Sequence, residues 1–228
     1  MPTRVFLLSP ARCDGKRAQL LLRDAAAFPL ARRLREPGGV PLGEVFSFLS
    51  GLYFRGKLAY ATKFGAGADG ASGSFVITTN RGLVTPDTRV TIDDLRQFGC
   101  TDIHEADLSY RDPLLRDARA IAEQLAQDAE VVLLGSVATA KYVGVLVEVF
   151  GGRLRFPAEF AGRGDMSRGG LMLRRVESGE ALTYVPIAGA ARRGKRPPKL
   201  EPVRKKRVVS AKAPGTARKR TEKVVPAE

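Results

Sequence analysis

Short apolar runs alternate with amphipathic segments along the first 187 residues. Each apolar run ends at Ser, Asn, Gly or Pro, which is typical of buried parallel strands. These runs predict strands at residues 5–8, 75–79, 131–134 and 153–156. Apolar positions spaced by three or four predict helices at residues 18–27, 30–35, 42–53, 112–127 and 137–150, and a capped helix start at residues 91–95. For the segment 42–53, a break at Gly51 or Gly56 is the alternative to one continuous helix.

This alternation predicts an α/β domain, with a mostly parallel sheet of about four strands and helices on both faces. Ligands bind such sheets at the carboxyl ends of the strands. The loops that come after the four predicted strands are therefore the place to look for a site. They are residues 9–16, 79–87, 135–141 and 157–168.

The periodic pattern stops after Ile187. Residues 188–228 contain no aromatic residue and are rich in Lys, Arg and Pro. Such a segment cannot bury enough apolar surface to offset the entropy of ordering it. The sequence therefore predicts an α/β domain over residues 1–187 and a disordered basic C-terminal tail over residues 188–228.

Most of the net charge of +14 lies in this tail. Residues 191–228 contain 14 Lys and Arg against 3 Asp and Glu, whereas the preceding residues contain 24 against 21. A charge segregated in this way favours a polyanionic partner, nucleic acid before an anionic membrane. The tail residues predicted to contact phosphates are Arg204, Lys205, Lys206, Arg207, Arg218, Lys219 and Arg220.

The composition also argues against several classes of protein. Two cysteines are too few for a disulfide framework, and no apolar stretch approaches the length of a membrane span, so we expect a soluble cytoplasmic protein, compatible with association with the nucleoid, and no membrane partner. One histidine, His104, is expected at the surface and cannot form a zinc site with two distant cysteines. Neither a Walker A motif nor a Rossmann glycine pattern is present, and no cofactor is expected.

The loop after the first strand combines Asp14 with two cations, Lys16 and Arg17, at a predicted helix N-terminus. That combination favours binding of a phosphate or another anion, although a solvated turn would look similar. Cys13 could be a reactive thiol beside these cations or a structural one.

Two further loops carry polar residues directly after a strand. Asn80 and Arg81 could contact a base or sugar edge, or simply form a tight turn. Ser136 and Lys141 could contact an anion, but Ser136 could equally cap the next helix. Since no histidine is placed to activate it, we do not expect Ser136 to be a nucleophile.

The fourth loop has an unusual density of glycines and charges. We interpret residues 162–170 as a glycine-rich ligand loop, with a capped helix as the alternative. Arg163, Ser167 and Arg168 would hold phosphate there. Glu159 and Asp165 are the candidate carboxylates for chemistry.

A family resemblance rests on two of these segments. Leu8-Ser9-Pro10-Ala11 is similar to the Ser-Pro-Ala-Lys start of the peroxide-stress YaaA family, with Arg12 in place of the lysine. Residues 82–87 resemble the Gly-(Leu/Val)-x-x-Pro-Asp segment of that family and of related families of unknown function, and the order of segments agrees over residues 4–175. The resemblance implies DNA binding and protection against oxidative DNA damage. A more distant similarity to the core of archaeosine synthase implies a nucleobase-handling fold of the uracil-DNA-glycosylase type.

Three functions are possible on these grounds, each as a hypothesis. The first is a nucleic-acid-binding protein, for DNA before RNA, whose tail contacts phosphates while the loops hold a nucleotide or base. The second is an enzyme that acts on an N-glycosidic bond, in which Asp14, Glu159 or Asp165 orients water or stabilises a cationic sugar. The third is a binding module for RNA or acidic proteins without chemistry.

Overall fold

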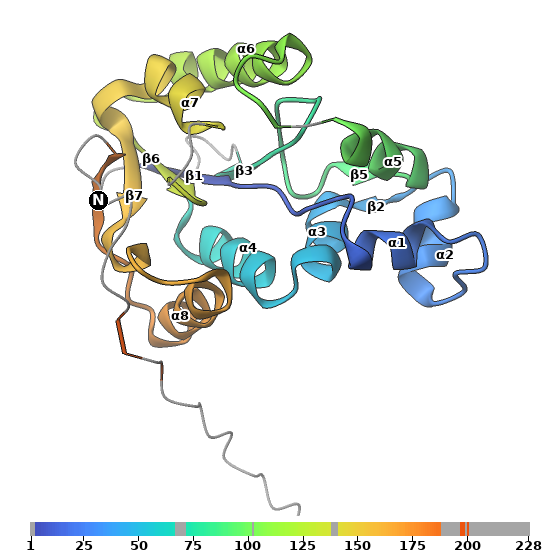
Figure 1. Ribbon diagram of the computed structural model, residues 1–228. Helices are drawn as coiled ribbons and strands as arrows, with labels where there is room; N and C mark the ends of the chain where they lie inside the picture. The colour runs from blue at the N-terminus through green and yellow to red at the C-terminus, as the bar shows by residue number, and fades with distance from the viewer. Residues whose placement is uncertain are drawn as a thin grey trace, which may run out of the picture.

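The computed structural model describes residues 3–66, 72–101, 103–137, 141–187, 197, 198 and 200. A six-stranded sheet with the order β4-β3-β1-β6-β7-β8 runs through these residues (Figure 1). Its strands are β1 (Arg4–Leu8), β3 (Ser74–Ile77), β4 (Leu83–Val84), β6 (Glu130–Leu134), β7 (Leu154–Pro157) and β8 (Tyr184–Pro186).

The four central strands are parallel and correspond to the four that the sequence predicts. β1 pairs with β3 on one side and with β6 on the other, and its apolar residues from Val5 to Leu8 are buried because helices cover both faces of the sheet. β4 and β8 add antiparallel edges that are too short to be recognised in the sequence. The α/β class with a mostly parallel sheet is thus confirmed.

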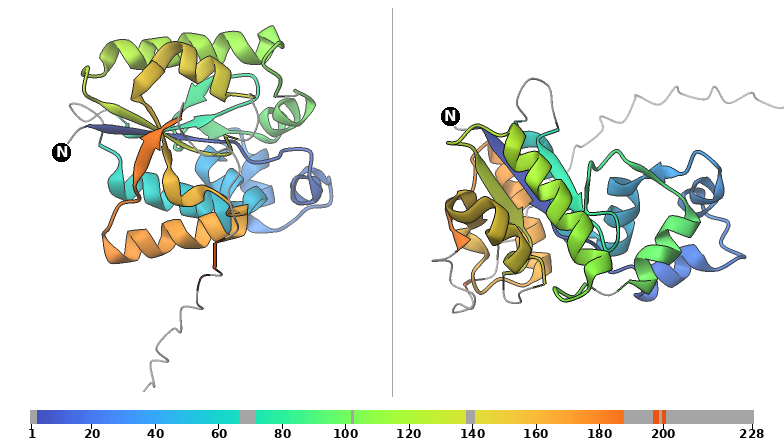
Figure 2. Two further views of the ribbon diagram at one scale, coloured as in Figure 1. Left: turned by 60° about the vertical axis from the view of Figure 1, so that its left-hand side comes forward. Right: turned by 90° about the horizontal axis from the view of Figure 1, so that it is seen from above.

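Two helices cover each face of the sheet. Helices α6 (Leu108–Gln124) and α7 (Val143–Phe150) lie on one face, and α4 (Leu52–Phe64) and α8 (Asp165–Ser178) on the other (Figures 1 and 2). α6 begins before the predicted position, since Asp107 caps it by accepting a hydrogen bond from the Ser109 N–H at 2.9 Å. α7 is shorter than predicted, and residues 138–140 lie outside the described part of the chain.

A smaller group of elements lies beyond the carboxyl end of β1 (Figures 1 and 2). It contains α1 (Lys16–Leu22), α2 (Pro29–Arg35), α3 (Leu42–Ser50), α5 (Ile92–Cys100) and the antiparallel pair β2 (Val40–Pro41) and β5 (Arg89–Val90). The predicted cap of α5 is present, because Thr91 and Asp94 form a capping box. This group faces the carboxyl ends of the strands and closes one side of the space in front of them.

The structure places the break in the helical segment at residues 42–53 at Gly51, one of the two expected positions, where φ is +59°. α4 then continues through Gly56 to Phe64. The packing of α4 against α8 corrects another prediction. Most of the expected loop 162–170 is the first part of α8. Its glycines allow two backbones to meet: a Cβ on Gly56 would lie 2.7 Å from Gly169 O, and one on Gly169 would lie 2.6 Å from Leu52 O.

The basic clusters at 204–207 and 218–220 and most of the predicted tail lie outside the described residues. Three tail residues are described, Pro197, Pro198 and Leu200, and they line a hollow beside the start of α8. Leu200 also packs against the hydrophobic core. In the described part of the chain no helix has the length and apolar character to cross a membrane.

Candidate functional site

A cleft of about 670 Å³ opens at the carboxyl ends of β1, β3 and β6. Its floor and walls come from both faces of the sheet and from the smaller group of elements. The residues that line it are Ser9, Pro10, Ala11, Arg12, Cys13, Asp14, Ser50, Tyr53, Thr79, Phe98, Gly99, Thr101, Ile103, Ser136, Lys141, Tyr142 and Asp165. The position agrees with the rule that ligands bind at the carboxyl edge of parallel sheets.

Ser9 is buried at the base of this cleft, directly after β1. Its N–H donates to Leu134 O at 3.2 Å, which continues the pairing of β1 with β6 by one residue. Gly135 comes directly after β6 beside it, and a Cβ there would come within 2.9 Å of Ser9 Cβ. The sheet therefore fixes the Ser9 backbone, and Gly135 leaves space for the hydroxyl group.

Lys57 of α4 reaches Ser9 from beneath the cleft. Its side chain is fully buried, and Nζ lies 2.6 Å from Ser9 O and 2.9 Å from Ser9 Oγ. Nζ also lies over the rings of Tyr53 and Phe54, at 4.4 and 4.9 Å from their centroids. Lys57 forms no ion pair with a carboxylate among the described residues, although it lies in the interior.

This environment changes the titration of the amine. Burial disfavours the charged form and lowers the pKa of Lys57 to about 7, while the negative charge of Asp165 opposes the shift and the positive charge of Arg168 adds to it. Near neutral pH a substantial fraction of Lys57 is therefore an uncharged amine, which can accept a proton.

Tyr142 lies on the other side of Ser9, just before α7. The backbone N–H of Ser136 donates to Tyr142 Oη at 3.1 Å. Burial raises the pKa of Tyr142, and hydrogen bonds with the Ser136 backbone and the Ser9 side chain oppose that rise. The Tyr142 hydroxyl oxygen thus accepts a backbone N–H at the edge of the cleft.

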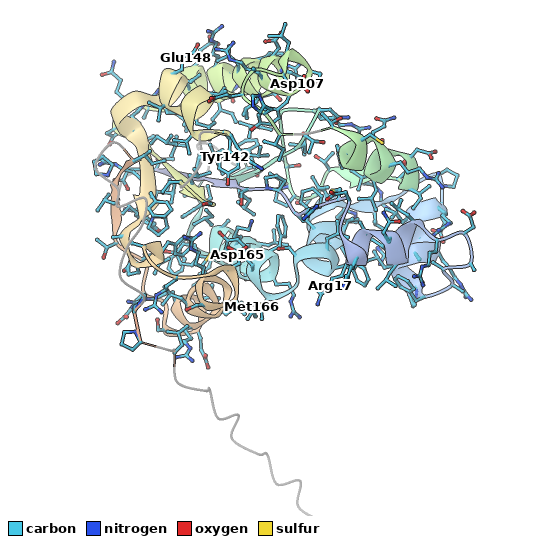
Figure 3. All side chains as sticks on the ribbon, in the orientation of Figure 1. Arg17, Asp107, Tyr142, Glu148, Asp165 and Met166 are labelled. Carbon is cyan, nitrogen blue, oxygen red and sulfur yellow. The ribbon has the colours of Figure 1, made fainter. Side chains whose placement is uncertain are left out.

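Asp165 begins α8 at the mouth of the cleft. Figure 3 shows it below the sheet, with Tyr142 above it. Its carboxylate lies 4.0 Å from a nitrogen of Arg168, whose Nη2 donates to Phe160 O at 3.1 Å. Tyr53 lines the same side, and burial raises the pKa of its hydroxyl. This wall thus combines an aromatic residue, a carboxylate and a nearby, partly buried guanidinium group.

Of the predicted catalytic and nucleic-acid-binding residues, four line this cleft: Asp14, Ser136, Lys141 and Asp165. Asp14 is exposed, and both of its oxygens accept hydrogen bonds from Arg12, at 2.6 and 2.9 Å. The hydrogen bond with Arg12 is the main cause that lowers the pKa of Asp14. A carboxylate paired in this way is a weak proton acceptor.

Lys16 and Arg17 lie at the start of α1 but do not line the cleft. Lys16 is exposed, and Arg17 donates to Phe48 O at 3.0 Å. Their position at a helix N-terminus is as predicted. The structure does not bring them to the strand ends, however, because Arg17 is directed toward α3.

Asn80 and Arg81 also lie outside the cleft lining. Arg81 pairs with Asp94 at the start of α5, and its guanidinium group lies over the Phe98 ring. Asn80 Oδ1 is buried without a hydrogen-bond partner in the described part of the chain. Arg81 thus ties the turn after β3 to α5.

Three further predicted site residues after the fourth predicted strand, Glu159, Arg163 and Ser167, do not line the cleft. They form hydrogen bonds with nearby residues instead. Glu159 accepts hydrogen bonds from the Thr183 N–H at 3.0 and 3.2 Å, before β8. Arg163 donates to Glu159 O and to Ser167 Oγ. Arg163 and Ser167 line the hollow beside Leu200, on the other side of the start of α8.

Cys13 lines the cleft but is buried, and burial raises its pKa to about 12. The thiol is therefore protonated at neutral pH, which favours the structural interpretation over the reactive one. His104 is exposed, as predicted. No group of three His, Cys, Asp or Glu residues that could hold a metal ion lies within the described ranges.

The central pair of the site is not evident from the sequence. Ser9 stands out only as part of the Ser-Pro-Ala segment, and Lys57 does not stand out at all. The signal for Lys57 is weak: a lysine on the apolar face of an amphipathic helix, one residue after a glycine and three after Phe54. Such a lysine is usually a surface residue, and only the packing of α4 and α8 shows that it is buried.

Comparison with protein-family models, curated proteins and solved structures gives no match for this chain. The similarity to the YaaA family therefore stays a prediction. A function for this chain has to be inferred from the geometry and chemistry of the cleft.

Proposed function

We propose that this protein binds nucleic acid, DNA in particular, and that the cleft receives one nucleotide or base. The observation that supports the proposal best is the lining of the cleft. Tyr53, Phe98 and Tyr142, all largely buried, are among the residues that line the cavity, together with Thr79 and Asp165. Aromatic rings suit stacking against a base, and hydroxyl and carboxylate groups suit hydrogen bonds with its edge.

Charge supports the same proposal. Lys141 lies among the cleft residues and is exposed, which suits contact with phosphates that flank a bound base. Arg12 is also exposed there, but it is paired with Asp14. The tail contributes many Lys and Arg residues but contains no aromatic residue that could stack against a base. Affinity would therefore come mainly from the tail and base recognition from the cleft.

The alternative of an N-glycosidic-bond enzyme has one observation in its favour, since Asp14 and Asp165 line the same cleft. Asp14 is a weak base because both of its carboxylate oxygens accept hydrogen bonds from Arg12. Glu159 accepts a hydrogen bond from the Thr183 N–H. These carboxylates therefore support binding better than they support this chemistry, and the alternative stays a prediction.

Neutralising the tail tests the proposal. In the full chain, Gln would replace the seven Lys and Arg residues of the clusters at 204–207 and 218–220. Binding of a fluorescent single-stranded DNA oligonucleotide would be measured across a salt series. Because each lost phosphate contact removes counterion release, we expect binding about tenfold weaker or more at about 0.1 M salt and a shallower salt dependence.

A chain that ends at Glu201 gives a second comparison, since it keeps Leu200 and its packing against the core. An RNA oligonucleotide of the same sequence tests the preference for DNA. Equal affinities and equal salt slopes for the wild type and the neutralised chain would contradict the role of the tail.

A further inference from the structure

The hydroxyl group of Ser9 lies between a buried amine and a phenol. Lys57 Nζ lies 2.9 Å from Ser9 Oγ on one side, and the Tyr142 hydroxyl borders the same Gly135 beside Ser9 on the other. Ser9 lines the cleft, whereas Lys57 does not. Among the cleft residues, Ser9 is the one with which Lys57 forms hydrogen bonds.

We propose that Ser9 is a nucleophile, that Lys57 is the base that deprotonates it, and that the cleft hydrolyses an ester or amide. This activity does not depend on nucleic-acid binding. Ser9 would be the catalytic nucleophile because it lines the cleft and its Oγ lies 2.9 Å from Lys57 Nζ, and Lys57 would take up the proton.

Hydrogen-bond geometry fits an uncharged Lys57. Nζ has two polar neighbours, Ser9 O and Ser9 Oγ. An ammonium group donates to both, but a neutral amine donates one N–H to the carbonyl oxygen and leaves its lone pair for the Ser9 hydroxyl proton. The lowered pKa of Lys57 makes this state accessible near neutral pH.

The absence of a carboxylate partner among the described residues also separates this lysine from an ordinary buried ion pair. A buried ammonium group is normally neutralised by a carboxylate. Asp165 lowers the cost of the charge from a distance, but it lies beside Arg168 and forms no ion pair with Lys57. The site therefore favours loss of a proton by Lys57.

Gly135 and Tyr142 orient the hydroxyl group. A Cβ on Gly135 would lie 3.1 Å from both Ser9 Oγ and Tyr142 Oη. Gly135 therefore permits these two oxygens to approach each other. We regard Tyr142 as a positioning residue that keeps Ser9 Oγ directed between the amine and the cleft.

The reaction balances with water as the only co-reactant. Lys57 takes the Ser9 proton as Oγ forms a bond to the carbonyl carbon. The bond from this carbon to the leaving oxygen or nitrogen then breaks, and the leaving group takes the proton from Lys57. Water attacks the acyl carbon and gives a proton to Lys57, and the C–Oγ bond breaks as Oγ regains that proton.

A fluorophosphonate probe tests the proposal in the full chain. Its phosphorus forms a bond to an activated serine oxygen and releases fluoride. We expect one adduct, which peptide mass spectrometry locates at Ser9. The rate of labelling should rise about tenfold between pH 6 and pH 8 as Lys57 loses its proton.

Four variants sharpen the test. Ser9→Ala should abolish the adduct, and Lys57→Met should slow labelling about a hundredfold or more while the helix is retained. Two matched controls, Ser178→Ala on α8 and Lys63→Met on α4, should label as the wild type does. Hydrolysis of p-nitrophenyl butyrate should rank the variants in the same order.

The pH profile of the wild type keeps the test decisive even if Lys57→Met fails to fold. The absence of an adduct at Ser9, or labelling that is independent of pH from 6 to 8, would overturn the proposal. An unchanged labelling rate in a folded Lys57→Met variant would do so as well.

Discussion

Replacing Gly169 with Ala is expected to destabilise the protein by roughly 3 kcal/mol or more. The new Cβ would lie 2.6 Å from Leu52 O and 2.9 Å from Tyr53 Cα. Both neighbours are backbone atoms of α4, so no side chain can rotate away. The two helices would have to separate, and that movement would open the packing between them. Urea unfolding at neutral pH measures the effect.

Gly170→Ala is the matched control for this prediction. Gly170 lies in the same helix, and a Cβ there meets only Leu200 Cδ1 at 3.6 Å, an ordinary contact. Because Ala favours a helix over Gly by about 1 kcal/mol, this variant should be as stable as the wild type or slightly more stable. Equal stabilities of the Gly169→Ala and Gly170→Ala chains would show that α4 and α8 are not in close backbone contact.

Lys57 is expected to make the free energy of unfolding rise with pH. Its pKa in the folded chain is about 7, whereas an unfolded lysine titrates at an ordinary value near 10.4. Between these values the unfolded chain binds a proton that the folded chain lacks, so increasing pH favours folding. From pH 6.5 to 8.5, the wild type should gain between about 1 and 2 kcal/mol relative to Lys57→Met.

Denaturant unfolding at several pH values measures this difference. Subtracting the Lys57→Met values removes the contributions of all other groups, including Cys13, whose raised pKa acts in the opposite direction at alkaline pH. Lys63→Met, on the exposed side of the same helix, should keep the pH dependence of the wild type. A difference that does not change with pH would mean that Lys57 stays charged in the folded chain.

The parallel strands of the sheet are accessible from sequence because they rest on local patterns, whereas their order in the sheet is not. The parallel strands are apolar runs, since both of their faces are buried, and the start of α5 is marked by Thr91 and Asp94. The position of a cleft at the strand ends is a consequence of the topology alone. Asp14, Ser136, Lys141 and Asp165 can therefore be identified from sequence as neighbours in the fold.

The centre of the site depends on contacts between distant segments, which a local pattern does not encode. Lys57 is buried because α4 packs beneath the sheet, where Nζ meets Ser9 and the rings of Tyr53 and Phe54. The glycines of residues 162–170 make that segment resemble a loop, although Gly169 permits a close contact between α8 and α4. The structural roles of two arginines also depend on distant partners. Arg17 donates a hydrogen bond to Phe48 O in α3, and Arg81 forms an ion pair with Asp94 in α5.

On the proposed function, the body of the protein receives a base in the cleft while the tail holds phosphates. Photo-crosslinking of a single-stranded DNA that contains 4-thiothymidine, with peptide mapping of the products, distinguishes the two parts. We expect crosslinks to residues that line the cleft, chiefly Tyr53, Phe98 and Tyr142. These crosslinks should persist when the tail is neutralised and the DNA concentration is raised to restore binding. Crosslinks confined to residues 201–228, or to body surfaces away from the cleft, would contradict the proposed function.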